Sequence, residues 1–74
     1  MNIILNVVTT SADGNHRYCC TNDRDGKIMY SKSNEGAVRK TISHLKKIVN
    51  AKKLNLLDTD INDDNGTKLT YQVI

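Results

Sequence analysis

The stretch SNEGAVRKTISHLKKIVNAKK (residues 33–53) contains the strongest secondary-structure signal in this 74-residue chain. Ser33 is a suitable helix N-cap, and Glu35 follows in the first turn, where the helix dipole favours an anion. Gly36 should cost the helix about 1 kcal/mol relative to Ala. Apolar residues then recur with helical spacing: Val38, Ile42, Leu45 and Val49, flanked by Ala37, Thr41 and Ile48. The stretch therefore predicts an amphipathic helix that ends near residues 51–53.

Three short apolar runs before this helix predict strands. Residues 2–8 (NIILNVV) are rich in β-branched side chains, and residues 16–21 and 27–31 alternate between apolar and polar positions. The sequence NDRDG separates the last two runs and favours a turn. In the resulting hairpin, we expect four side chains to face the core together: Tyr18, Cys20, Ile28 and Tyr30.

Two further strands are predicted after the helix. The dipeptide Asn65-Gly66 favours a type I′ hairpin turn, and residues 67–74 (TKLTYQVI) alternate strictly. Residues 54–61 (LNLLDTDI) fit the preceding strand, although residues 54–57 are also compatible with a longer helix or a loop.

Together these elements predict a single α+β domain over residues 1–74. The expected order is β-β-β-α-β-β, with a mainly antiparallel sheet of four or five strands and one helix packed on one face. The other face would meet solvent or a partner, and its polar residues would be Arg17, Thr21, Lys27, Thr70 and Gln72.

The charges are unevenly distributed along the chain, whose formal net charge is +3. Residues 33–53 hold six cations and one anion, whereas residues 54–74 hold one cation and four anions. On the predicted helix, Arg39 and Lys46 form one row, and Lys40 and Lys47 form the next. Such a face could bind nucleic-acid phosphates, but lysines on the solvent side of a helix also serve solubility alone.

The inventory of reactive side chains argues against catalysis, and we predict no enzyme activity, no cofactor and no metal site. Cys19 and Cys20 are adjacent, so a strand directs them to opposite faces, and only His16 and His44 could complete a zinc site. Neither acidic turn matches a calcium loop. No apolar run is long enough to cross a membrane, and reduced cysteines suggest a cytoplasmic protein.

The remaining prediction is a non-enzymatic binding protein. Asn, Lys and Ile supply 24 of the 74 residues, which is typical of AT-rich coding sequence and suggests a phage or mobile-element origin. We expect the protein, as a monomer or small homo-oligomer in the host cytoplasm, to bind and inhibit a host protein or protein–nucleic acid complex, such as a CRISPR, restriction or other nuclease system. The candidate contacts are Arg17, Lys27, Asp60, Asp63 and Asp64. The alternative is direct nucleic-acid binding through Arg39, Lys40, Lys46 and Lys47.

Overall fold

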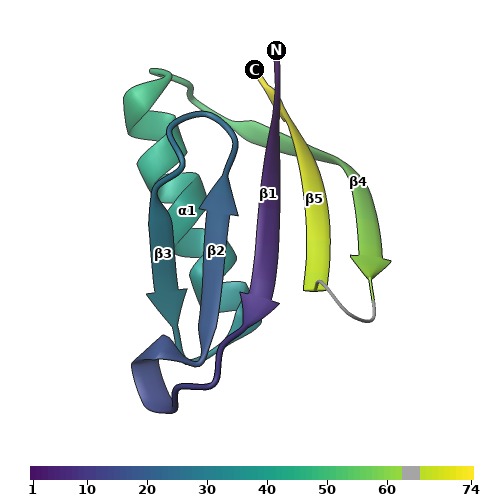
Figure 1. Ribbon diagram of the computed structural model, residues 1–74. Coiled ribbons are helices and arrows are strands. Elements are labelled where there is room, and N and C mark those ends of the chain that lie inside the picture. The colour runs from purple at the N-terminus through teal and green to yellow at the C-terminus, as the bar shows by residue number, and fades with distance from the viewer. Residues whose placement is uncertain (63–65) are drawn as a thin grey trace.

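The computed structural model describes residues 1–62 and 66–74, which form one helix packed on a five-stranded antiparallel sheet (Figure 1). The predicted fold class and the order β-β-β-α-β-β are thereby confirmed. The elements are β1 (Asn2–Thr9), the short 3-10 helix η1 (Gly14–His16), β2 (Tyr18–Asn22), β3 (Ile28–Ser31), α1 (Asn34–Ile48), β4 (Leu54–Asn62) and β5 (Gly66–Val73).

The strands lie in the order β3-β2-β1-β5-β4, and every neighbouring pair is antiparallel. Helix α1 carries the chain from one edge of the sheet, β3, to the other edge, β4. Strand β1 is central, as its apolar composition suggests, and the two chain ends lie side by side at one end of the sheet (Figure 1). In the described part of the chain, no helix is long and apolar enough to cross a membrane.

The core lies between α1 and the face of the sheet that the helix covers. Alternate residues of β1 point toward the helix, and Ile3, Leu5 and Val7 are almost completely buried. The other buried apolar side chains are Cys20, Ala37, Leu45, Leu54, Leu69 and Tyr71.

Local signals define both ends of α1. Ser33 is the N-cap, and its side chain accepts a hydrogen bond from the backbone N–H of Gly36. At the other end Asn50 adopts a left-handed conformation (φ 52°), and the N–H of Ala51 bonds to the carbonyl of Lys46 in a Schellman arrangement. The helix therefore ends at Ile48, a few residues earlier than predicted.

The buried face of α1 is also rotated slightly from the predicted apolar face, which consisted of Val38, Ile42, Leu45 and Val49. Its fully buried residues are Ala37, Thr41 and Leu45. Val38, Ile42 and Val49 are only partly buried, because they lie on the flanks of the contact with the sheet. Thr41 is accommodated in the core because its hydroxyl donates to the carbonyl of Ala37.

The predicted core face of β3 was wrong by one residue. Cys20 is opposite Met29 in the ladder, so Met29 and Ser31 face the helix, while Ile28 and Tyr30 are exposed on the outer face. A shift of one residue in register exchanges the two faces of a strand, and the turn that precedes β3 sets this register. Strand β2 also begins two residues later than predicted, because residues 14–16 form η1.

Gly66 begins β5 at a position that requires glycine. Its φ is 85°, and a Cβ atom there would overlap the backbone carbonyl of Val7 in the adjacent strand β1. The predicted type I′ turn at Asn65-Gly66 rests in part on Asn65, which lies outside the described residues.

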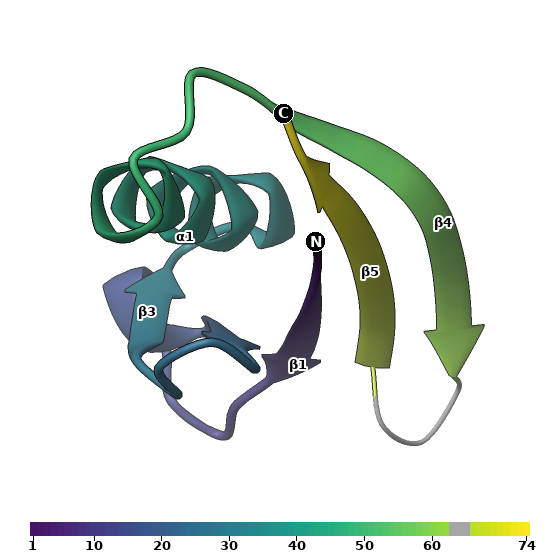
Figure 2. The same ribbon diagram turned by 90° about the horizontal axis from the view of Figure 1, so that it is seen from above.

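The helix covers only part of the sheet. It packs on β3, β2 and β1, whereas β5 and β4 lie beyond its flank, as the view from above shows (Figure 2). This incomplete coverage leaves part of the helix-facing side of β5 and β4 uncovered.

Candidate functional site

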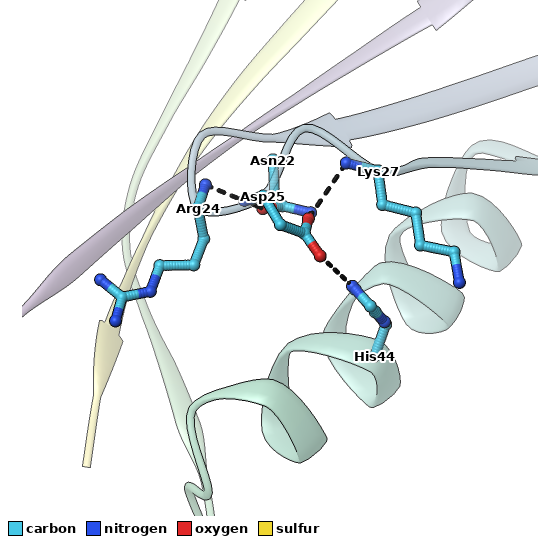
Figure 3. Close-up of polar contacts among 5 residues, drawn as sticks. All are labelled: Asn22, Arg24, Asp25, Lys27 and His44. Carbon is cyan, nitrogen blue, oxygen red and sulfur yellow. Dashed lines mark hydrogen bonds and ion pairs between the residues drawn. The ribbon is translucent and has the colours of Figure 1, made fainter.

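A polar turn between β2 and β3 positions the first part of the candidate site (Figure 3). The buried side chain of Asn22 accepts hydrogen bonds from the backbone N–H groups of Arg24 (2.8 Å) and Asp25 (3.0 Å), and its Nδ2 donates to Asp25 Oδ1 (3.0 Å). The same Asp25 oxygen accepts the backbone N–H of Lys27 at 3.0 Å. These bonds define the conformation of the turn and the direction in which Lys27 leaves it.

The other carboxylate oxygen of Asp25 connects this turn to α1. It lies 2.6 Å from Nε2 of His44, which points toward it from the helix (Figure 3). The backbone N–H of Lys27 and the bond to His44 both favour the ionised carboxylate, and they lower the pKa of Asp25 from 3.8 to about 2. The contact holds the turn against the helix.

Lys27 consequently lies beside the cationic side of α1, where an open groove of about 410 Å³ forms. We call it the basic groove. Its lining consists of Lys27, Met29, Arg39, Lys40, Ser43, His44 and Lys47. Four of these seven side chains are positively charged at neutral pH, and they come from two separate parts of the chain.

The cations of the basic groove have little internal compensation. Among the described residues, no lysine or arginine forms an ion pair with a carboxylate, and the one contact of this kind is between His44 and Asp25. Lys40 donates to the backbone carbonyl of Tyr30 in the edge strand β3 at 2.8 Å, which leaves two ammonium protons for other acceptors. The groove is therefore suited to bind an anion.

Three of the four residues predicted to bind nucleic acid line the basic groove: Arg39, Lys40 and Lys47. Lys46 lies on the opposite flank of α1. The prediction had assigned Lys27 to partner contacts on the outer face, but the structure places it among these helix cations instead.

The other predicted partner contacts are dispersed. Arg17 is exposed at the end of η1, and Asp60 lies on the outer face of β4, opposite Lys68. Asp63 and Asp64 lie outside the described residues. The described members of this set therefore do not form one surface.

A second open groove, of about 540 Å³, lies on the other flank of α1, between the helix and strands β4 and β5. We call it the apolar groove. Its apolar lining is Val38, Ile42, Leu56, Leu69 and Tyr71, and its polar lining is Asn34, Glu35, Arg39, Ser43 and Lys46. Arg39 and Ser43 thus border both grooves.

The cysteines lie in neither groove. Cys20 is buried and Cys19 is half-buried, and both are free thiols. They lie on opposite faces of β2 as predicted, and burial raises the pKa of Cys20. No cluster of three or more potential metal ligands occurs among residues 1–62 and 66–74.

Sequence reasoning missed two features of the site. His44 was considered as a zinc ligand, not as the partner of Asp25. The apolar groove was also missed, because the sequence does not show how much of the sheet the helix covers. The sequence held no signal for it, because the exposure of Leu56 is apparent only in the structure.

Comparison of the chain with protein-family models, with curated proteins and with solved structures finds no match.

Proposed function

We propose that this protein is a non-enzymatic binding protein that contacts the phosphates of a nucleic acid through the basic groove. The observation that supports this proposal is the convergence of Lys27 with the helix cations Arg39, Lys40 and Lys47. Ser43 and His44 add hydrogen-bonding groups between them.

The spacing of the cations favours a polymer over a small anion. Arg39 and Lys47 are eight residues apart on α1, which corresponds to roughly 12 Å along the helix axis. One strand of B-DNA carries a phosphate about every 3.4 Å along its axis, so the groove is long enough to meet several phosphates. A groove open to solvent also suits a continuous backbone.

The test is a fluorescence anisotropy titration of random-sequence duplex and single strands at salt concentrations from about 50 to 200 mM. We expect the wild-type affinity to fall steeply with salt. The double variant K27Q/K47Q should bind at least about tenfold more weakly, and its slope of log K against log salt should be shallower by about 2, since each phosphate contact contributes about 0.9.

The matched control is K52Q/K68Q, which removes the same charge outside the basic groove. It should retain the wild-type salt slope. Absence of binding at low salt would exclude the proposal, and so would equal weakening by the two double variants.

We propose as a second candidate that the protein binds a host protein and inhibits it, for example within a CRISPR, restriction or other nuclease system. The apolar groove favours this candidate, because open apolar surface on a small protein is typical of protein docking. The test is inhibition of a purified nuclease or CRISPR complex by wild-type protein but not by L56Q, whose substitution is in this groove. Equal inhibition by both proteins would assign the effect to another surface.

A further inference from the structure

The apolar groove exists because α1 leaves part of the sheet uncovered. Leu69 and Tyr71 of β5 form its floor and are nearly buried, while Val38 and Ile42 of α1 form one wall. Leu56 of β4 forms the other wall, and 48% of its surface is exposed. Strands β5 and β4 lie beyond the flank of α1 (Figure 2), and the groove between them and the helix is open to solvent.

On the helix-facing side of β4, the apolar side chains of Leu56 and Ile61 are separated by Thr59, and only Leu56 lines the groove. The ladder places Leu56 opposite Tyr71 and Ile61 opposite Thr67, and all four side chains are on this side. Ile61 is 73% exposed. Leu56 and the apolar floor beside it form open apolar surface, which is costly to leave in water and is typical of docking sites.

The charges around the apolar groove specify the partner further. On the helix wall, Arg39 and Lys46 border the groove, and Glu35 is its one described carboxylate. Strand alternation directs Asp58 and Asp60 to the outer face, where they are opposite Thr70 and Lys68. The groove is therefore apolar at its floor and cationic along one rim.

We propose that the apolar groove binds an acidic amphipathic helix of a partner protein. The apolar face of that helix would cover Leu56, Leu69 and Tyr71, and its carboxylates would meet Arg39 and Lys46. These two cations are seven residues apart, or roughly 10 Å along α1, so carboxylates two turns apart on the partner match them. This inference rests on the second candidate function, not on phosphate binding.

Two other occupants fit less well. An added strand on the open edge of β4 would meet the β-bulge between Leu56 and Asp58, which interrupts regular pairing. A second copy of the chain carries the same net charge of +3, which disfavours its approach to the cationic rim.

The direct test uses a fluorescein-labelled helical peptide of about 18 residues with Leu at positions i, i+3, i+4 and i+7 and Glu on both flanks. Fluorescence anisotropy should show saturable binding of this peptide to the full chain. Two control peptides, one with Lys in place of Glu and one with Gln in place of Leu, should bind at least about tenfold more weakly.

A matched pair of variants locates the binding site. L56Q removes an apolar side chain of the groove, whereas L57Q changes the adjacent bulge residue, which is equally exposed but does not line the groove. Because both positions are about half exposed, both variants should fold, and circular dichroism checks this. We expect L56Q to weaken peptide binding about tenfold and L57Q to leave it within twofold.

Several results would overturn the inference. They are absence of peptide binding, equal binding of the acidic and basic peptides, and equal effects of L56Q and L57Q. Concentration-dependent dimerisation that L56Q abolishes would identify a second copy as the occupant, and weakened nucleic-acid binding by L56Q would assign the groove to that ligand. If the peptide does not bind, phosphate binding by the basic groove can still be tested separately, because neither Lys27 nor Lys47 lines the apolar groove.

Discussion

Gly36 lies in the first turn of α1, beside the side chains of Ser31 and Ser33. Helix propensity alone predicts that replacement by Ala would stabilise the protein by about 1 kcal/mol. The structure indicates the opposite, because a Cβ at this position would overlap Ser31 Oγ and crowd Ser33 Oγ, the N-cap oxygen. Glycine is used here for space rather than for backbone freedom.

We therefore expect G36A to destabilise the protein by about 1–2 kcal/mol, a typical cost of overpacking. In an S31A background this cost should shrink, because the overlapping hydroxyl is absent. Urea denaturation of the four proteins in a double-mutant cycle measures the coupling between the two residues. An equal cost of G36A in both backgrounds would contradict this explanation.

Substitution of the two cysteines should affect the free energy of unfolding differently, and the two thiols should differ in reactivity. C20S places a hydroxyl in the core and should cost about 1–3 kcal/mol, whereas C19S should stay within about 0.5 kcal/mol of wild type. Iodoacetamide labelling followed by mass spectrometry should modify Cys19 first, because Cys20 is buried and its pKa is raised. Both variants should retain nucleic-acid binding, and loss of binding by a folded C19S or C20S protein would give the cysteines a functional role.

At the scale of elements, the turn between β2 and β3 is attached to α1 through one carboxylate, that of Asp25. Its pKa is about 2 in the folded protein, below its ordinary value of 3.8. A lowered folded-state pKa means that the ionised group stabilises the protein at pH values above about 4, and that this contribution disappears as the pH falls to about 2.

The variant D25N keeps an acceptor oxygen but has no charge. It should be less stable than wild type at pH 7, and the difference should close between about pH 4 and pH 2. Urea denaturation across this range measures the difference. The control is D13N, since the side chain of Asp13 makes no capping hydrogen bond. A difference that remains constant down to pH 2 would show that the charge of Asp25 does not stabilise the fold.

The register of β3 and the buried face of α1 show how sequence patterns can locate an element without orienting it. The alternation in residues 27–31 predicts a strand correctly, but it does not state which set of side chains faces the core. Which side chains of β3 face the core depends on the hydrogen bonds of Asn22 and Asp25, which are specific to this turn. On α1, the small residue Ala37 permits close approach to the sheet, so the buried face is centred on Ala37 rather than on Val38.

For the whole molecule, the decisive feature is that one helix covers three strands of a five-stranded sheet. A helix is about 10 Å wide, whereas five strands spaced about 4.8 Å apart span roughly 20 Å, so complete coverage is impossible. The uncovered strands β5 and β4 border the apolar groove, whereas the basic groove lies on the other flank of α1, beside Met29 of β3.

The sequence by itself determined the α+β class, the order of elements, the N-cap at Ser33 and the opposite directions of Cys19 and Cys20. These features depend on periodicity and on residues close together in the chain. The register of β3, the placement of Lys27 beside Arg39, Lys40 and Lys47, and the apolar groove were decided only by the tertiary structure. They depend on contacts between distant residues, such as that of Asp25 with His44, and on how far one helix extends across the sheet.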